Sequence, residues 1–220
     1  MESYFECSKE SLKLDYPFRL IIIGPMNSGK STFMLNYIKH LTELVNVKDD
    51  KQTEVIIISE IQSTISELER ICRDNKYGFR NMKGIPSWDA LSSESSNSTH
   101  KIIIFEDCSV DLNASNQANI KNFLFQSRHN NFSMVLLTHN TNHAYAKKDS
   151  FERCFLQNAS AFAFTLGHFS DTRLITNFMK DFLDFSVSDT KQVIKMAHEV
   201  MDFPIVYVSN KQFRNVNEGS

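Results

Sequence analysis

Residues 24–31 of this chain read Gly24-Pro25-Met26-Asn27-Ser28-Gly29-Lys30-Ser31. The pattern is a glycine, four residues and then Gly-Lys-Ser, and Thr32 follows it. It comes directly after the apolar run 20–23 and opens into a segment with apolar residues at helical spacing: Phe33, Met34, Ile38, Leu41 and Val45. Strand, loop and helix in this order are the context that a phosphate-binding loop requires. The stretch therefore predicts a nucleoside-triphosphate site at residues 24–32.

Each part of this loop has a chemical role toward a polyphosphate. Gly24 and Gly29 let the backbone curl so that successive N–H groups point inward, and the positive end of the following helix adds to the field. Lys30 is expected to reach the β- and γ-phosphates as a point charge. The Ser31 hydroxyl is expected to bind Mg²⁺.

Length and composition predict a globular α/β protein. The chain has 220 residues, of which 41% are hydrophobic and 23% charged. This is enough for one domain with a substantial core. We expect a polar N-terminal arm at 1–17 and a single ATPase-type domain at 18–220.

Net charge and cysteine content restrict the nucleic-acid contacts and the cellular compartment that we expect for the protein. The net charge of −2 argues against a protein that coats nucleic acid with its whole surface, but allows a ring with a few DNA contacts per subunit. The four cysteines are scattered without metal-ligand spacing, which indicates reduced thiols in an intracellular protein. No apolar run approaches the ~20 residues that span a bilayer, and no signal peptide is evident, so we expect a soluble chain.

Hydrophobic periodicity predicts alternating strands and helices. Expected strands are 20–23, 53–59, 101–107, 132–139, 161–166 and 205–209; expected helices are 61–72, 113–127, 170–182 and 188–201. Ser59 with Gln62 resembles a capping box. Residues 73–100 lose periodicity, apart from a short helical segment at 86–91 and a Ser-rich loop. Alternating elements predict a mostly parallel sheet flanked by helices.

A second nucleotide signature lies at the end of the strand 101–107, where an apolar run is followed by Glu106 and Asp107. Carboxylates at this strand end share the sheet edge with the phosphate loop. We expect Glu106 to bind Mg²⁺ and Asp107 to polarise the attacking water. The usual order places Asp first, so the two roles could be exchanged; a solvated strand end is the structural alternative.

An acidic pair on a separate strand favours P-loop ATPases of the RecA/ASCE type. No Asn-Lys-x-Asp motif supports a small GTPase. Nucleoside kinases stay open as an alternative, but they usually need an Arg-rich lid, and arginines are sparse here. Such ATPases place a polar residue at the end of the next strand. Thr138 is the candidate, followed by His139 and Asn140, although a histidine there is more often structural.

The motifs together resemble a known family. They are the phosphate loop, Ile102-Ile103-Ile104-Phe105-Glu106-Asp107-Cys108, Gln126-Ser127-Arg128-His129-Asn130, Ser133-Met134-Val135-Leu136-Leu137-Thr138-His139, Phe151-Glu152-Arg153 before Asn158, and the segment 203–208. Over about residues 18–209 they resemble the poxvirus-type genome-packaging ATPases of the FtsK–HerA superfamily of ring translocases. Departures are Gln126-Ser127 where a glycine often precedes the arginine, Thr138 in place of glutamine, and glutamate before aspartate.

The resemblance implies ATP hydrolysis coupled to translocation of double-stranded DNA into a preformed capsid. It implies a homo-oligomeric ring at a capsid or portal vertex, at the viral assembly site in the host cytoplasm or nucleus, or associated with the virion. Arg153 or Arg128 would stabilise the γ-phosphate of a neighbouring subunit, a surface arginine being the alternative for each. DNA-contacting loops would be 92–101 or the segment at Lys147-Lys148.

Two other functions stay open from the sequence. One is a related ring ATPase that serves DNA processing or phage-type export. The other is a nucleotide switch that binds ATP without useful turnover, and the acidic pair argues against it.

Overall fold

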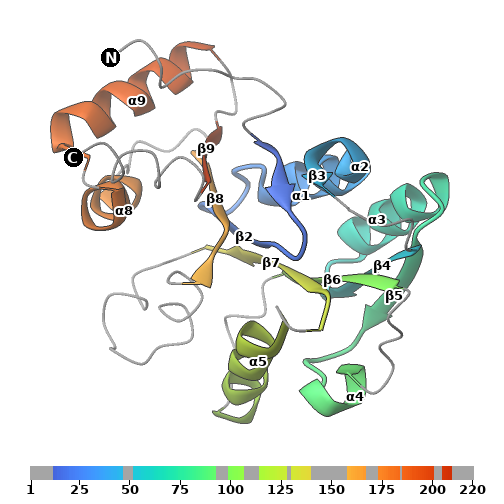
Figure 1. Cartoon of the computed structure of the whole chain (residues 1–220). Coiled ribbons are helices and arrows are strands. Elements are labelled where there is room, and N and C mark those ends of the chain that lie inside the picture. The colour runs from blue at the N-terminus through green and yellow to red at the C-terminus, as the bar shows by residue number, and fades with distance from the viewer. Residues whose placement is uncertain are drawn as a thin grey trace.

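A seven-stranded sheet forms the centre of the molecule. The computed structural model describes residues 12–46, 52–92, 99–106, 114–127, 130–139, 158–166, 173–183, 185–200 and 205–209. The sheet strands are β2 (Arg19–Ile23), β4 (Gln52–Ile58), β5 (Gly78–Met82), β6 (Thr99–Glu106), β7 (Phe132–Thr138), β8 (Ala161–Thr165) and β9 (Ile205–Ser209). Their spatial order is β5-β4-β6-β7-β2-β8-β9 (Figure 1). Every neighbouring pair is parallel except β8 and β9. The expected α/β fold with a mostly parallel sheet is confirmed.

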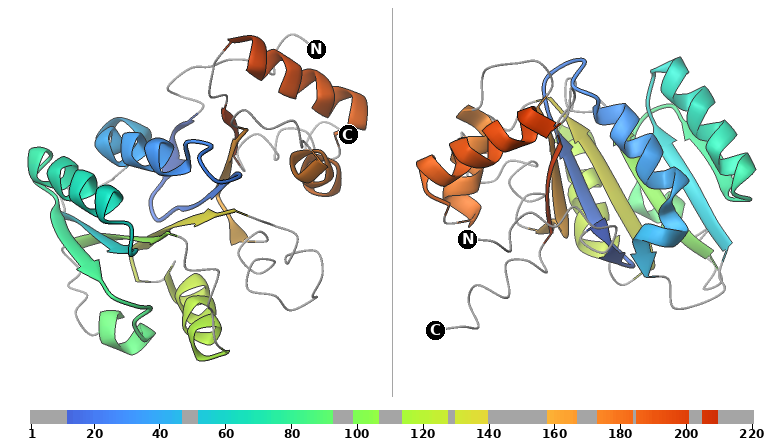
Figure 2. Two further views of the ribbon diagram at one scale, coloured as in Figure 1. Left: turned by 180° about the vertical axis from the view of Figure 1, so that it is seen from behind. Right: turned by 90° about the horizontal axis from the view of Figure 1, so that it is seen from above.

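Helices cover both faces of this sheet. They are α1 (Lys30–Lys39), α2 (Leu41–Leu44), α3 (Gln62–Asp74), α4 (Trp88–Ser92), α5 (Ala114–Gln126), α8 (Arg173–Leu183) and α9 (Val187–Val200). Helices α1 and α3 lie side by side on one face (Figure 2). Helices α4, α5, α8 and α9 contribute to the apolar core on the opposite face.

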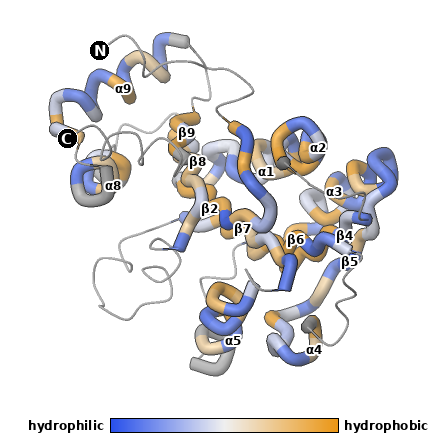
Figure 3. The backbone as a smooth tube through the Cα atoms, viewed as in Figure 1, coloured by the Kyte–Doolittle hydropathy of each residue, from blue (hydrophilic) through white to orange (hydrophobic). Residues whose placement is uncertain are grey.

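The side chains of each strand point alternately to the two faces of the sheet, and an apolar core forms on each face. In β2, Leu20 and Ile22 pack with α1 and α3, whereas Ile21 and Ile23 pack with α5 and α8. All four are buried, and each such side chain contributes about 1.5–3 kcal/mol by leaving water. The central strands are accordingly mostly hydrophobic (Figure 3).

The strand that enters the phosphate loop and the strand that ends in the acidic residue are not neighbours. Strand β7 lies between β2 and β6 and pairs with both. The acidic residue therefore lies on a strand of its own, as expected for the RecA/ASCE type. The carboxyl ends of β2, β6 and β7 therefore meet at one edge of the sheet, where ligands of open α/β folds bind.

The segment after the loop differs from its prediction. The apolar pattern predicts one helix face reaching Val45, but α1 ends at Lys39, and His40 has φ −104° and ψ 22°. After the short α2, Val45 begins strand β3 (Val45–Asn46), which pairs in parallel with β1 (Leu14–Asp15). Burial of Leu41, Leu44 and Val45 accounts for the apolar spacing without a continuous helix. Residues 14–15 of the expected arm thus form a strand of a separate small sheet.

Strand β5 was not predicted from the sequence. It is an edge strand that pairs only with β4 among the described strands, and its residues are half-buried or exposed. Partial burial leaves a weak alternation that periodicity does not detect. The short helix expected at 86–91 is confirmed as α4, where Trp88 packs against Phe123 and Phe132. The other expected elements occur close to their predicted bounds.

None of the helices in these described ranges is both long and apolar enough to cross a membrane. Cys72 is a free, buried thiol, as expected for a core cysteine, and burial raises its pKa to about 12. The other three cysteines lie outside the described residues.

Candidate nucleotide-binding site

The loop between β2 and α1 has the backbone shape that its glycines allow. Asn27 and Gly29 have positive φ values of 59° and 91°. Gly29 is the N-cap of α1, and its carbonyl accepts the N–H of Phe33 at 2.8 Å. The N–H groups of residues 30–32 belong to the first turn of α1, where N–H groups point out of the helix end. The helix N-terminus therefore presents donors and a positive dipole to an anion.

Gly24 holds the loop tightly against two neighbouring strands. Its N–H donates to the carbonyl of Thr138 at 3.2 Å. A Cβ at this position would collide with the hydroxyl and carbonyl oxygens of Thr165 and with the hydroxyl of Ser28. Those two hydroxyl groups lie 2.6 Å apart, and that of Thr165 also donates to the carbonyl of Ile23 at 3.3 Å. The loop is thus fastened to β7 and β8, and only glycine fits at its first position.

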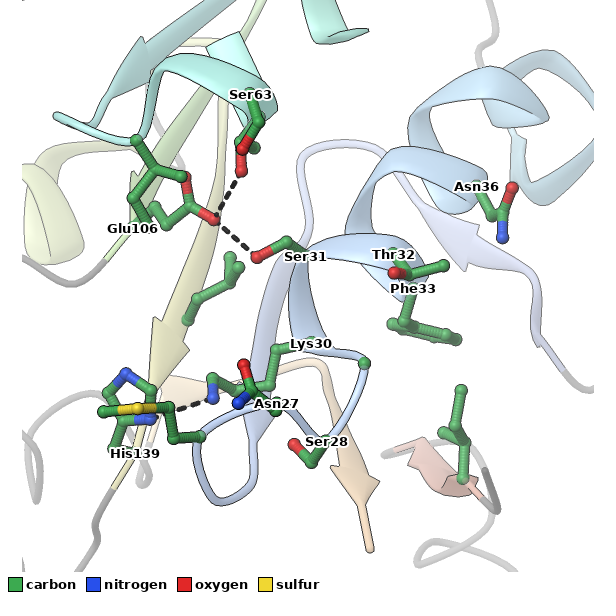
Figure 4. Close-up of a pocket in the computed structure, with 16 residues that line it drawn as sticks. Asn27, Ser28, Lys30, Ser31, Thr32, Phe33, Asn36, Ser63, Glu106 and His139 are labelled. Atoms are coloured by element: carbon green, nitrogen blue, oxygen red, sulfur yellow. Dashed lines mark hydrogen bonds between the residues drawn. The ribbon is translucent and has the colours of Figure 1, made fainter. Parts of the chain in front are cut away.

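Lys30 points back into the loop. It is 6% exposed, and its Nζ donates to the carbonyls of Gly24 at 3.0 Å and Pro25 at 2.8 Å. Its Nζ also lies 2.9 Å from Nδ1 of His139, and the two side chains point toward one another (Figure 4). A charged lysine can only donate, so Nδ1 accepts in this pair. The ammonium group thus rests on protein oxygens and an imidazole nitrogen, within the loop that we expect to hold phosphate.

Glu106 ends β6 directly opposite Ser31. The carboxylate is 3% exposed, and its Oε1 accepts from the Ser31 hydroxyl at 2.6 Å (Figure 4). Its Oε2 accepts from the Ser59 hydroxyl at 2.7 Å, and Oε1 also accepts from the Thr64 hydroxyl at 3.2 Å. The sequence predicted the meeting of Glu106 and Ser31 but not the other two contacts.

The expected capping box at Ser59 is wrong. Helix α3 begins at Gln62 with Ile61 as its N-cap, and no side chain caps it. The Ser59 hydroxyl accepts the N–H of Ile61 at 3.0 Å and gives its proton to Glu106. The physical reason is that α3 begins later than a capping box at Ser59 requires, so Ser59 accepts the N–H two residues on and not that of a residue in the first helical turn.

Strand alternation separates Thr138 from His139. In β7, Val135 and Leu137 pack on the side of α1, and His139 follows them with the same parity and lines the cleft. Thr138 has the opposite parity, is 3% exposed and is not among the residues that line the cleft. Its carbonyl supports the loop at Gly24. The residue of this strand end that contacts Lys30 is therefore His139.

Several predicted site residues lie outside the described residues, namely Asp107, Arg128, Arg153, Asn140 and Lys147-Lys148. The same holds for residues 93–98 of the loop expected to contact DNA. Lys101, at the end of that loop, is 3% exposed, lies 3.6 Å from Glu54 Oε2 and covers the Phe132 ring at 5.6 Å. Internal contacts therefore occupy Lys101, and it does not fit a DNA-contacting role.

Ser127, which precedes Arg128 in the sequence, lies near the edge of the sheet opposite to the phosphate loop. The Ser127 hydroxyl accepts from Nη2 of Arg19 at 3.2 Å, and that nitrogen also donates to the carbonyl of Leu124. Arg19 is the first residue of β2, whereas the phosphate loop follows its last. The five residues of β2 span roughly 16 Å, which is longer than an arginine side chain. The end of α5 is thus remote from this chain's own phosphate loop.

Lys30, Ser31, Thr64, Glu106 and His139 border one cleft with a volume of about 880 Å³. Its lining comes from the loop, the first turns of α1 and α3, the ends of β6 and β7, and the start of β9. Glu106 lies at one end, and Phe33, Asn36 and Ile205 also line the cleft. Sequence reasoning missed Ser59, Thr64, Thr165 and these last three residues. A hydroxyl residue directly after the buried strand 53–58 was the available signal for Ser59.

The described residues contain no cluster of three or more His, Cys, Asp or Glu side chains that could hold a metal ion. Ser31 and Glu106 together offer two oxygen ligands within 2.6 Å of each other. Hard oxygen donors suit Mg²⁺, which keeps several waters and takes further ligands from substrate phosphates. The donor set fits that ion bound together with a nucleotide.

Comparison with known proteins gives one family and several structural likenesses. A sequence profile described as "Poxvirus A32 protein" matches residues 4–160. No curated protein matches the sequence significantly. Among solved structures, EccC of Thermomonospora curvata (ATPases 2 and 3, in complex with a signal sequence peptide) has a TM-score of 0.48 at 11% identity, with 70% of this chain and 32% of that chain covered.

Two further structures are similar to a comparable degree. The cytoplasmic domain of the Thermomonospora curvata type VII secretion ATPase EccC has a TM-score of 0.45 at 10% identity, with 68% of this chain and 19% of that chain covered. A protein described only as an ATPase has a TM-score of 0.48 at 11% identity, with coverages of 68% and 65%. This chain therefore spans about a third of the first of these proteins and a fifth of the second.

Proposed function

The chain belongs to the poxvirus A32 protein family, and from that premise we propose that it is a packaging ATPase that drives double-stranded DNA into a preformed capsid. The observation that carries this proposal is the pairing of two elements across one cleft. The phosphate loop brings Lys30, and β6 brings Glu106 to the Ser31 hydroxyl. Lysine and a metal-binding carboxylate are the parts that phosphoryl transfer requires.

The phosphates of ATP bind at the N-terminus of α1. The N–H groups of residues 30–32 and the helix dipole attract the polyphosphate. Lys30 then exchanges its carbonyl and histidine contacts for phosphate oxygens. Little backbone movement is needed, because Gly24, Ser28 and Thr165 already hold the loop in place.

Ser31 and Glu106 would hold Mg²⁺ when the nucleotide is bound. The ion would neutralise the negative charge of the phosphates. Within this chain, Glu106 keeps its carboxylate at that point and Ser31 offers its hydroxyl oxygen. Asp107 orients and deprotonates the attacking water, and His139, which contacts Lys30, takes the position beside the γ-phosphate for which Thr138 was expected.

The cleft also has room for the nucleoside. Phe33 and Ile205 offer apolar surface, and Asn36 lies one turn further along α1 with an exposed amide. An aromatic ring with a branched aliphatic chain suits a planar base, and an amide can both donate to and accept from its edge. We assign these three residues to the adenosine end of the nucleotide.

The motor acts as a ring of identical chains at the capsid or portal vertex. Its single ATPase domain comprises residues 18–220 together with residues 14–15, which form β1 and pair with β3. Arg153 or Arg128 reaches the nucleotide of a neighbouring subunit. Assembly takes place inside the host cell.

The experiment that tests the proposal measures ATP hydrolysis and DNA movement together. Purified protein is assayed with Mg²⁺-ATP with and without double-stranded DNA, and displacement of a triplex-forming strand reports translocation. Lys30→Ala serves as the matched inactive chain, and native mass is measured with and without ATP. We expect DNA-stimulated hydrolysis, strand displacement and a nucleotide-dependent ring. Hydrolysis without strand displacement would remove the packaging function, and no hydrolysis with DNA present would remove the ATPase itself.

A further inference from the structure

The carboxylate of Glu106 is held by more of the protein than the phosphate loop. Ser59 lies directly after β4, and Thr64 lies in the first turn of α3. Their hydroxyls donate to Glu106 at 2.7 and 3.2 Å, and both side chains are buried, at 7% and 5% exposure. Strands β4 and β6 pair in register up to Ile58 and Phe105, which places Ser59 beside Glu106.

We propose that Ser59 and Thr64 are positioning residues that keep the Glu106 carboxylate in place for the Mg²⁺-nucleotide complex. The inference rests on the proposed function, because it concerns the same cleft. Neither residue belongs to the phosphate loop or to the acidic strand.

Ser59 is oriented for this role. Its oxygen accepts the N–H of Ile61 at 3.0 Å, and a hydroxyl has a single proton to give. That proton points to Oε2 of Glu106. The backbone of the β4–α3 connection therefore directs the hydroxyl toward the carboxylate, and the N-terminus of α3 adds a favourable dipole.

The need for such support follows from the chemistry of the carboxylate's other partner. Ser31 donates to Oε1 of Glu106 at 2.6 Å. When the Ser31 oxygen coordinates a metal ion, its proton takes a new direction, so this hydrogen bond to Glu106 can change. Ser59 and Thr64 do not depend on that change. Glutamate also has one more rotatable bond than aspartate, and long side chains lose about 1.5–2 kcal/mol of rotamer freedom when they are held. Two additional hydroxyl donors offset part of that loss before the nucleotide arrives.

If Ser59 and Thr64 had only a structural role, their removal would have a different effect from the one that positioning predicts. If the hydroxyls only satisfy a buried carboxylate, their removal lowers the free energy of unfolding and leaves metal binding unchanged. If they position the carboxylate, metal affinity falls while nucleotide affinity without metal stays the same.

The test uses the full chain with ADP and Mn²⁺ as the metal probe, read by electron paramagnetic resonance. The variants Ser59→Ala and Thr64→Val each remove a hydroxyl group. The variant Thr64→Ser keeps the hydroxyl group at position 64. Ser66→Ala is the matched control, since its exposed hydroxyl contacts Gln62 on the same helix. ADP affinity in EDTA and the thermal midpoint of the nucleotide-free protein are measured for each.

We expect Ser59→Ala and Thr64→Val to weaken Mn²⁺ binding about tenfold each, because hydrogen bonds to charged groups are the stronger class. ADP affinity in EDTA stays within about twofold, and Thr64→Ser and Ser66→Ala behave like the parent. In a Glu106→Gln background, Ser59→Ala produces no further loss, since the coupled partner is already gone.

Unchanged Mn²⁺ affinity with a lowered thermal midpoint would overturn the inference, and so would loss of folded structure in both hydroxyl-removal variants. Equal losses of Mn²⁺ and metal-free ADP binding would also overturn it. The readout needs neither hydrolysis nor DNA. A chain that binds ADP and shows the metal effect but never hydrolyses ATP would refute only the proposed function.

Discussion

The Nζ atom of Lys30 lies 2.9 Å from Nδ1 of His139, a residue 109 positions further along the chain. The cation expected to bind phosphate is therefore paired within the protein. Nucleotide binding must break this contact and those to the Gly24 and Pro25 carbonyls. The loop is thus held by the ammonium group that we propose to bind the phosphates.

His139→Ala should tighten ADP binding. A hydrogen bond of this kind contributes about 0.5–1.5 kcal/mol, so releasing Lys30 is worth roughly two- to tenfold in affinity. Turnover of ATP should fall, because the polar group beside the γ-phosphate is lost. Titration calorimetry with Mg²⁺-ADP and a steady-state ATPase assay measure the two effects. Weaker ADP binding in His139→Ala would show that the histidine supports the bound state instead.

Thr165→Val should loosen the phosphate loop. The change keeps the side-chain shape but leaves Ser28 without its 2.6 Å partner and removes the bond to the Ile23 carbonyl. A lost buried hydrogen bond costs about 1–3 kcal/mol. For a chain of this size, the thermal midpoint should fall by roughly 2–4 °C per kcal/mol. Thr165→Ser retains the hydroxyl and should lose little; an equal drop in both variants would assign the effect to packing.

Asp107→Asn should bind ATP normally and fail to hydrolyse it. The amide has the size of the carboxylate but cannot accept a proton from the attacking water. Single-turnover hydrolysis and fluorescent-nucleotide binding are the measurements. If the rate survives, the base is another residue, and the exchange of roles with Glu106 becomes the next hypothesis to test.

Arg153→Ala should abolish turnover only in the assembled ring. Arginine supplied to a neighbouring site stabilises the γ-phosphate charge in the transition state. Mixing Arg153→Ala with Lys30→Ala subunits should restore part of the ATPase rate, because some interfaces then combine an intact loop with an intact arginine. Arg128→Ala is tested in parallel, and mixtures that stay inactive would exclude supply between subunits.

The folded chain should lose stability at alkaline pH. Burial raises the pKa of the Cys72 thiol to about 12 and raises the pKa of the Tyr37 and Tyr207 phenols above their usual value of 10. The unfolded chain then releases these protons first as pH rises, so the free energy of unfolding falls from about pH 9 upward. Thermal midpoints between pH 7 and 11 should show this decline. Cys72→Ala should flatten its first part, and a midpoint constant up to pH 11 would contradict the prediction.

Local patterns were sufficient for much of the fold and for the meeting of the phosphate loop with Glu106. Glycine spacing and the apolar run at 20–23 predicted the phosphate loop, and buried strands with polar ends predicted where Glu106 would meet Ser31. These features depend on neighbours within a few residues, so the sequence displays them directly. The helix break at His40 and the edge strand β5 were missed, because packing against distant residues decides them.

The sequence by itself therefore determined an α/β chain with a phosphate-loop motif and its acidic strand. The tertiary structure decided which hydroxyls hold Glu106 and that His139, not Thr138, faces Lys30. Ser59 and Thr64 stand 47 and 42 positions from Glu106, and only the strand order brings them together. The pairing of β7 with β2 and β6 sets the sheet face to which each of its side chains points. This decides which of the adjacent residues Thr138 and His139 faces the cleft. Such choices depend on hydrogen bonding across the sheet, which no stretch of sequence contains.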